Sequence, residues 1–166
     1  MEDLSHGNVL VCVNGHVVTA KANTDEIPEK YCARCGDIMI NKCLECGTFI
    51  KGIPRLASQI DPPYSYFGNP YIRQSYCTNC GKPYPWTTQH ENAAYELIEF
   101  ANSLNQQEKD DWKSTIPVLI KETPKTTVAV VKFKAFAEKA GVEIGKAVKD
   151  IVVHVVSEVV KKSIVG

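Results

Sequence analysis

The sequence predicts a small α+β protein, with short β-hairpins in the first half of the chain and an all-α second half. Two observations lead to this prediction. All seven cysteines of the 166-residue chain lie between Cys12 and Cys80, where they form close pairs. From Thr87 onward, apolar residues recur at the three-to-four-residue spacing of amphipathic helices. We therefore expect a hairpin domain over residues 1–86 and a C-terminal region of three to four helices over residues 87–166.

Four close pairs of metal-ligand residues organise the first half. The pairs are Cys12/His16, Cys32/Cys35, Cys43/Cys46 and Cys77/Cys80. A structural zinc ion takes four Cys or His ligands, and two of them usually come from one tight turn. Eight ligands in four pairs therefore match two tetrahedral zinc ions and predict two zinc ribbons built from short hairpins and knuckles.

Other uses of the cysteines fit less well. Seven is an odd number, so a closed disulfide set would leave one thiol over. The chain opens Met1-Glu2-Asp3 without a secretory signal, which predicts a cytoplasmic protein with reduced thiols. A redox Cys-x-x-Cys is an alternative, but all three such pairs are followed by glycine, as in a zinc knuckle. Iron in the four-cysteine site is a further alternative, since tetrahedral sulfur ligation suits iron as well as zinc.

The eight ligands can be grouped in two ways. Sequential grouping places Cys12, His16, Cys32 and Cys35 on one ion and Cys43, Cys46, Cys77 and Cys80 on the other. Interleaved grouping, as in a cross-brace, joins the first pair with the third and the second with the fourth. We favour the sequential grouping because each knuckle has strand-like flanks, so that consecutive knuckles form complete ribbons.

The first elements expected are short strands around the ligand pairs. Residues 8–20 contain two β-branched runs on either side of Asn14-Gly15, a strong hairpin signal that places Cys12 and His16 opposite each other. Further short strands are expected at residues 38–40 and 48–50. Residues 51–76 contain four prolines, which exclude a long helix or a central strand. The aromatic residues of the loop at 60–76 serve either as a binding surface or as a cover for the small zinc cores.

The second half contains the expected helices. Thr87 or Thr88 can cap a first helix that ends near Leu104. The pattern Asn105-x-x-Glu108 predicts the start of a second helix, which Pro117 can end early. Thr123-Pro124 is typical of the N-cap and first position of a third helix that carries Val128, Val131, Phe133, Phe136 and Ala137 and ends at Gly141.

The last helix is expected over residues 142–165, where valines recur at helical spacing. Its longest uncharged run has seven residues, Ile151–Ser157, against about 20 for a membrane span. His154 lies in this run and is expected to be a packed or exposed histidine rather than a metal ligand.

Charge does not point to a nucleic-acid partner. The chain carries 19 basic and 19 acidic residues, so its net charge is zero. Residues 87–111 contain six acidic residues and one lysine, whereas residues 112–166 contain ten lysines and five acidic residues. The acidic segment could pack on the basic one, or both could be solvated helix faces.

The ligand motifs resemble those of zinc-ribbon proteins, and more closely those of an uncharacterised bacterial family of double zinc-ribbon proteins with a helical C-terminal region. The resemblance rests on Cys-Val-Asn-Gly-His at 12–16, the three Cys-x-x-Cys-Gly knuckles, and residues 76–86. It implies a cytosolic bacterial protein in which zinc has a structural role.

Three classes of function follow from these patterns. The favoured one is a non-catalytic scaffold or protein-interaction protein, whose helical tail self-associates or binds a protein partner. The alternative is a nucleic-acid-binding module, because basic residues lie near the knuckles among aromatic residues: Arg34, Lys42, Lys51, Arg55, Arg73 and Lys82. An enzyme is disfavoured, since all eight ligands are used in closed sites and no other catalytic set is visible.

Overall fold

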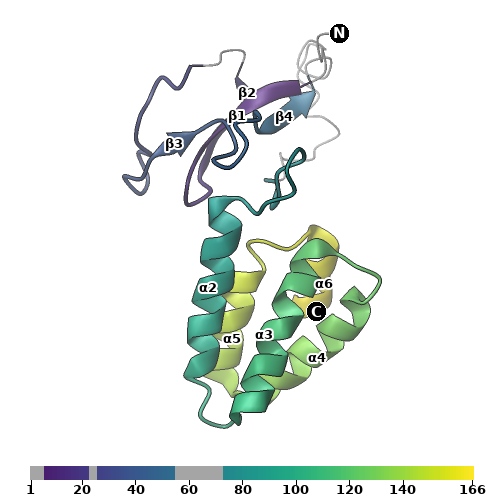
Figure 1. Cartoon of the computed structure of the whole chain (residues 1–166). Helices are drawn as coiled ribbons and strands as arrows, with labels where there is room; N and C mark the ends of the chain where they lie inside the picture. The colour runs from purple at the N-terminus through teal and green to yellow at the C-terminus, as the bar shows by residue number, and fades with distance from the viewer. Residues whose placement is uncertain (1–5, 23–25, 55–72) are drawn as a thin grey trace. The chain divides into compact units, whose positions relative to one another are not determined.

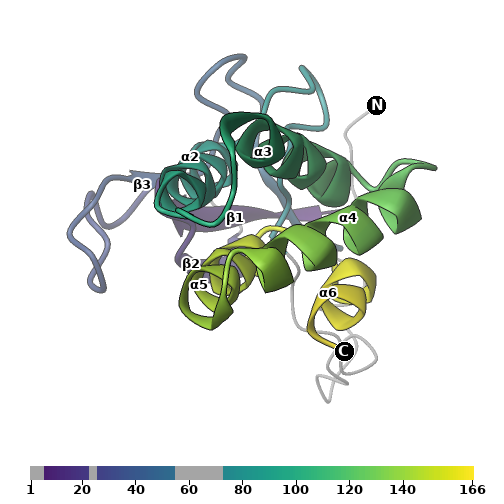
Figure 2. The same cartoon turned by 90° about the horizontal axis from the view of Figure 1, so that it is seen from below.

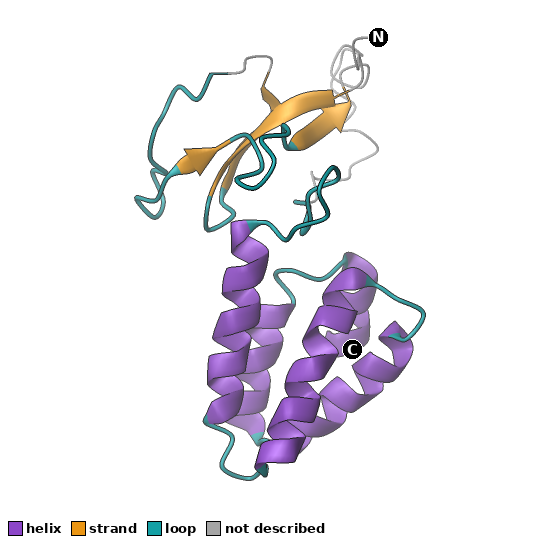
Figure 3. Cartoon of the chain, in the orientation of Figure 1, coloured by secondary structure: helices purple, strands orange, loops and turns teal. Residues whose placement is uncertain are grey.

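Figure 1 shows the computed structural model of the chain, which describes residues 6–22, 26–54 and 73–166. The chain divides into two compact units, Met1–Trp86 and Thr87–Gly166. The strands belong to the first unit, and the helices follow them in the sequence (Figure 3). The predicted small α+β fold class is confirmed.

Strand β1 (His6–Cys12) is the centre of a small antiparallel sheet. Strand β2 (Val17–Ala22) pairs with one edge of β1 across the Asn14-Gly15 turn, as the sequence predicts. Strands β3 (Met39–Ile40) and β4 (Lys51–Pro54) both pair with the other edge, β3 near Cys12 and β4 near His6. The outgoing strand expected at residues 48–50 lies three residues later, and Phe49 forms only an isolated bridge with Lys42.

The two faces of β1 enter two different apolar clusters. Val9 and Val11 are fully buried in a core that also contains Cys43 and Cys77. Leu10 and Cys12 point the other way and join Cys32 and Met39. This division follows from the two-residue alternation of a strand, and it makes β1 a structural component of both clusters.

Aromatic residues close the larger of these clusters. The rings of Tyr84 and Trp86 are both buried and stack with centroids 4.7 Å apart. The indole N–H of Trp86 donates to the carbonyl oxygen of Gln74 at 2.9 Å. Gly52 allows β4 to lie close to the hairpin, because a Cβ atom there would lie 2.1 Å from the carbonyl oxygen of Ala20.

The second unit contains five helices within its described residues, one more than the three to four expected. Figure 2 shows α4 lying among the other helices, and it contacts α3, α5 and α6. The helices are α2 (Pro85–Glu99), α3 (Gln106–Lys121), α4 (Thr126–Lys139), α5 (Val142–Val152) and α6 (Glu158–Val165). Trp112 is fully buried at the centre of this unit, with its ring 5.9 Å from that of Phe133.

The extra helix arises in the valine-rich last segment, where the single helix expected over residues 142–165 is wrong. Helix α5 ends at Val152, and α6 begins after Ser157, whose hydroxyl accepts a hydrogen bond from the amide of Val160. Ser157 is therefore an N-cap in extended conformation, which breaks the helix inside a continuous apolar pattern.

Two predicted helix starts are also wrong. Helix α2 begins at Pro85 rather than after Thr87 or Thr88, since proline suits the first helical position. Helix α4 begins at Thr126, and Thr123 instead closes a turn in which its hydroxyl accepts from the Lys125 amide at 3.2 Å. Pro117 does not end α3, which continues to Lys121.

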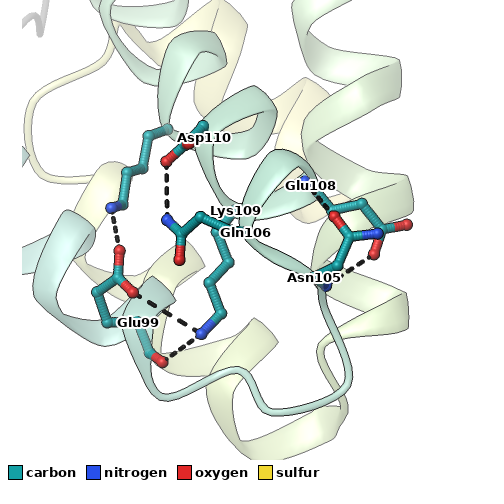
Figure 4. Close-up of polar contacts among 7 residues, drawn as sticks. Glu99, Asn105, Gln106, Glu108, Lys109 and Asp110 are labelled. Atoms are coloured by element: carbon teal, nitrogen blue, oxygen red, sulfur yellow. Dashed lines mark hydrogen bonds and ion pairs between the residues drawn. The ribbon is translucent and has the colours of Figure 1, made fainter.

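The start of α3 agrees with its sequence pattern (Figure 4). The Asn105 side chain accepts from the Glu108 amide at 3.0 Å, and the Glu108 carboxylate accepts from the Asn105 amide at 3.0 Å. Some acidic residues of the 87–111 segment also pair with lysines, Glu99 with Lys109 and Lys113, and Glu108 with Lys139. One side chain of each pair is partly buried and the other is more exposed, so each pair makes a modest contribution to stability.

Candidate metal centre

The three Cys-x-x-Cys-Gly segments adopt the same local conformation. In each, the glycine amide donates to the carbonyl oxygen of the first cysteine, at 2.8 Å in the first knuckle and 2.9 Å in the other two. The glycines have φ of 74°, 73° and 70°, a conformation that favours glycine over residues with a side chain. No atom lies within 4 Å of a Cβ built at these positions, so the backbone conformation, and not lack of space, requires glycine. The three glycines are Gly36, Gly47 and Gly81.

The hairpin turn between β1 and β2 provides the fourth ligand pair. The amide of Gly15 donates to the carbonyl oxygen of Cys12 at 2.8 Å, and the amide of Cys12 donates to the carbonyl oxygen of His16 at 3.1 Å. Gly15 has φ of 85°, which completes the turn. Both ligand side chains consequently lie on the same side of the hairpin end.

The first cluster brings together Cys12, His16, Cys32 and Cys35, whose ligand atoms all lie within 4.8 Å of one another. The Sγ atom of Cys12 lies 3.4 Å from Nδ1 of His16 and 3.7 Å from Sγ of Cys35. The Sγ atom of Cys32 lies 3.7 Å from the same Nδ1 atom.

The second cluster brings together Cys43, Cys46, Cys77 and Cys80, again within 4.8 Å. The Sγ atoms of Cys43 and Cys80 are 3.7 Å apart, as are those of Cys46 and Cys77. The ligand pairs are thus grouped sequentially, and the interleaved grouping is not formed.

These separations match the edges of a tetrahedron around a zinc ion. With Zn–S bonds of ~2.3 Å, two sulfur ligands lie ~3.8 Å apart, and a sulfur and a nitrogen ligand lie ~3.6 Å apart. The measured separations of 3.4–3.7 Å agree with both values. They are far longer than a disulfide bond of ~2.05 Å, and all seven cysteines are free.

Burial differs systematically within each pair. The first member of every pair is buried, whereas the second is more accessible. The buried members are Cys12, Cys32, Cys43 and Cys77. Each candidate site is therefore anchored in an apolar cluster on one side and reaches the surface on the other.

The thiols of the second cluster have widely different proton affinities. Hydrogen bonds from the hydroxyl and then the amide of Thr48 lower the pKa of Cys46 to about 6. The Lys82 amide lowers the pKa of Cys80, but burial and the neighbouring thiols outweigh it and raise the pKa to about 12. Four adjacent thiols cannot all ionise without a compensating cation, so this donor set suits a metal ion.

Two polar residues that the sequence patterns did not assign to the metal sites lie beside the ligands. The Asn14 side-chain amide donates to Sγ of Cys35 at 3.4 Å and to the Asp37 carboxylate at 2.5 Å. Oγ1 of Thr48 lies 3.4 Å from Sγ of Cys46. Such partners orient metal ligands and tune their basicity.

Arg73 connects the segments that carry the two clusters. Its guanidinium donates to the carbonyl oxygen of Gly15, in the hairpin turn of the first cluster. Its Cζ atom also lies 5.4 Å from the ring centroid of Trp86, in the core beside the second cluster. The sequence placed Arg73 only among the basic residues near the knuckles.

Two further predictions concern residues away from the clusters. His154 belongs to neither group of ligands, is exposed, and lies with its ring centroid 6.0 Å from that of His90. The aromatic loop at 60–76 lies mostly outside the described residues; within it, Tyr76 is half-buried and forms a bridge with Pro83.

The small sheet with two groups of four Cys or His ligands defines a double zinc-ribbon-like protein. The chain belongs to a family described as uncharacterized protein conserved in bacteria (DUF2321), whose model matches residues 6–164. No curated protein and no solved structure matches the chain. Among the described residues, no helix has the length and apolar character to cross a membrane.

Proposed function

We propose that the protein is a non-catalytic scaffold or protein-interaction protein in which two zinc ions per chain have a structural role. The observation that carries this proposal is the pair of complete donor sets with tetrahedral spacing. A catalytic zinc ion keeps one coordination position for water, whereas four protein ligands close the site. The ligands would be Cys12, His16, Cys32 and Cys35 at one ion and Cys43, Cys46, Cys77 and Cys80 at the other.

A structural role also agrees with the small cores of the first unit. Among the described residues, the buried cluster around Cys12 contains Leu10, Cys32 and Met39 besides that residue. Apolar burial on this scale cannot offset the entropy of ordering the chain, so metal binding would supply folding free energy.

Metal analysis of the purified chain tests the zinc assignment. We expect about two equivalents of zinc, as the two donor sets predict. Cobalt substitution should give the absorption of tetrahedral thiolate ligation at both sites. A cobalt spectrum of five- or six-coordinate metal, or rapidly exchanging metal-bound water, would contradict closed structural sites.

The interaction role is tested by capture of partners from a bacterial lysate. We expect the metal-loaded chain to retain a protein partner or to self-associate through residues 87–166. The matched control is the zinc-loaded chain with Val128→Ser and Val131→Ser, two substitutions at exposed residues of α4. Hydrolytic or redox turnover by the purified protein would contradict the non-catalytic assignment.

Nucleic-acid binding is the second candidate because Tyr31 is 62% exposed and lies next to Lys30. An exposed ring beside a cation can stack on a base. However, two of the basic residues near the knuckles make internal contacts, Lys42 with the Phe49 ring at 4.4 Å and Arg73 with Gly15. Salt-dependent retention on DNA or RNA, lost in Tyr31→Ala, would favour this candidate over the scaffold role.

A further inference from the structure

The outer face of α4 carries a row of apolar side chains. Val128 is 58% exposed and Val131 is 64% exposed, and Ala135 continues the row one turn later. The spacing of three and then four residues places the three side chains on one stripe of the helix. The opposite face, with Ala129, Phe133 and Ala137, provides the buried contacts of α4, so this row is not needed for the core.

Two hollows lie beside α4. One, of about 220 Å³, lies between Thr127 and Val130 of α4 and Val159 of α6. The other, of about 490 Å³, lies between the end of α4, α5 and Val165 of α6, and its lining includes the charged residues Glu138, Lys146, Lys149 and Asp150. The rim residues Val142, Val159 and Val165 are 68–89% exposed, so apolar side chains lie near both ends of the row on α4.

Lysines line the other side of the row. Lys125, Lys132 and Lys139 are seven residues apart, so they lie on one line along the helix. Lys132 is exposed, and Lys139 keeps a side-chain exposure of 53% although it pairs with Glu108. Residues 122–166 as a whole contain eight lysines and five acidic residues.

We propose that this face of α4, the α4 row, docks an amphipathic helix of another protein whose apolar stripe is flanked by acidic residues. The proposal rests on the interaction role proposed above and names its surface and its partner class. Apolar residues at spacings of three and four, with charges beside them, form the pattern by which one helix recognises another. Helix α4 has 14 residues and is about 21 Å long, which matches about four turns of a partner helix.

Charge and composition argue against a second copy of this chain as the partner. Two α4 rows facing each other in antiparallel orientation would bring their lysine lines together. The helices of the acidic segment offer no matching apolar row: the exposed residues are Thr88, Gln89, Asn92, Glu96 and Glu99 in α2 and Gln106, Gln107, Asp110, Asp111, Ser114 and Lys121 in α3. A lipid surface is disfavoured because the row is narrow and carries no aromatic residue.

The test uses the full zinc-loaded chain and two labelled helical peptides. Both peptides have leucines at heptad positions a and d; one has glutamates at e and g, and the other has lysines there. We expect the acidic peptide to bind with an affinity that falls as salt rises, and the lysine peptide to bind at least about tenfold more weakly. Fluorescence anisotropy measures both affinities.

Matched substitutions locate the surface. Val128→Ser with Val131→Ser should weaken acidic-peptide binding by at least about tenfold, because these residues supply the apolar contact. Val18→Ser, at a residue of the first unit with the same 58% exposure as Val128, should leave binding unchanged. All three side chains are exposed, so circular dichroism should confirm that the variants fold.

Charge reversal provides a second, independent readout. Lys132→Glu should weaken binding of the acidic peptide and strengthen binding of the lysine peptide. Lys30→Glu, at an exposed lysine of the first unit, should do neither. Equal binding of the two peptides, or unchanged binding by the Val128/Val131 double variant, would overturn the proposal.

Other occupants give distinct results. Binding to anionic phospholipid vesicles without binding to the acidic peptide would identify a lipid surface as the occupant. A dimer that sedimentation detects in the wild type and not in the double variant would identify a second copy of the chain. In the lysate experiment, a partner retained equally by the wild type and the double variant overturns only the α4 row. Absence of any partner counts against the interaction role, and peptide binding then decides the α4 row separately.

Discussion

At the scale of single residues, each ligand is expected to contribute to one site alone. Cys35→Ser removes a donor from the first cluster, and Cys80→Ser removes one from the second. We expect each variant to retain about one equivalent of tightly bound zinc, since three protein ligands hold the ion far less strongly than four. Competition with a chromophoric chelator measures the loss.

The control for this prediction lies inside a knuckle. Ala33 is exposed and stands between Cys32 and Cys35 without contributing a ligand, so Ala33→Ser should retain two equivalents. If Cys35→Ser retained both ions with wild-type affinity, Cys35 could not be a zinc ligand.

Asn105 is the best-defined cap of the helical unit. Its side chain and that of Glu108 satisfy each other's backbone amides at the start of α3. Asn105→Ala should lower the free energy of unfolding by about 1 kcal/mol, because the amide of Glu108 at the helix start would lose its hydrogen-bond acceptor. Asn102→Ala, at an exposed loop position three residues earlier, should cause a much smaller change in urea denaturation.

Sequence patterns identify the ligands better than the residues that support them. The eight ligands are recognisable because a short spacing and a following glycine are local features. Thr48 lies two positions from Cys46, whereas Asn14 and Arg73 act through atoms that only folding brings near, Cys35 at 21 positions from Asn14 and the Gly15 carbonyl oxygen at 58 positions from Arg73. No local spacing predicts such partners.

At the scale of elements, α3 tolerates a proline that the sequence suggested would end it. Pro117 lies inside the helix, and α3 continues through the buried Leu119 and Ile120. Proline cannot donate to the carbonyl oxygen of Lys113, and its ring crowds that carbonyl. Burial of the following turn offsets this cost, which local propensity cannot reveal.

Pro117→Ala should therefore stabilise the helical unit. We expect the free energy of unfolding, measured by helical circular dichroism in urea, to rise by about 1 kcal/mol or more. Pro124→Ala is the control, because Pro124 is exposed in the turn before α4. Destabilisation by Pro117→Ala would indicate that packing of the ring outweighs the missing hydrogen bond.

Ion pairs between helices make the stability of the helical unit depend on pH. The Lys113 ammonium lowers the pKa of Glu99 below 4.5, and the Lys139 ammonium, with the Asn105 amide, lowers that of Glu108. Because these pKa values are lower in the folded state, the contribution is present above the unfolded value and is lost as pH falls through the folded values.

The Glu99→Gln/Glu108→Gln variant should accordingly lose less thermal stability than the wild type between about pH 5 and pH 3. Glutamine at 108 preserves the capping box, so the comparison isolates charge. Glu96→Gln, at an exposed glutamate of the same helix as Glu99, should follow the wild-type curve. Parallel curves for the double variant and the wild type would show that the ion pairs do not stabilise the fold.

At the scale of the whole molecule, the two units should respond differently to removal of metal. The ligands all lie in Met1–Trp86, whereas Thr87–Gly166 has a core of its own around Trp112. A strong chelator should abolish the dispersed amide resonances of the strands while most of the helical circular dichroism persists. Strand resonances that remain dispersed without metal would contradict a structural role for zinc.

The broad arrangement was predictable because it depends on the helical spacing of apolar residues, the β-branched runs of the hairpins and the number of metal ligands. The pairing of strands in the sheet was less predictable. That β4 and β3 both pair with β1 depends on contacts such as Val9 with Ile50, which are distant in the chain. Likewise, the break between α5 and α6 depends on the extended conformation of Ser157, in a valine-rich segment that also contains His154 and Glu158.

Strand β1 has one further consequence for how the protein matures. A shift of β1 by one position would exchange its faces, so that Cys12 would leave its cluster and Val9 and Val11 would leave theirs. The first zinc ion to bind would therefore hold β1 in register and favour binding of the second ion. Native mass spectrometry at limiting zinc should then find fewer singly loaded chains than two independent sites would give, although a chain with one intact donor set still binds one ion.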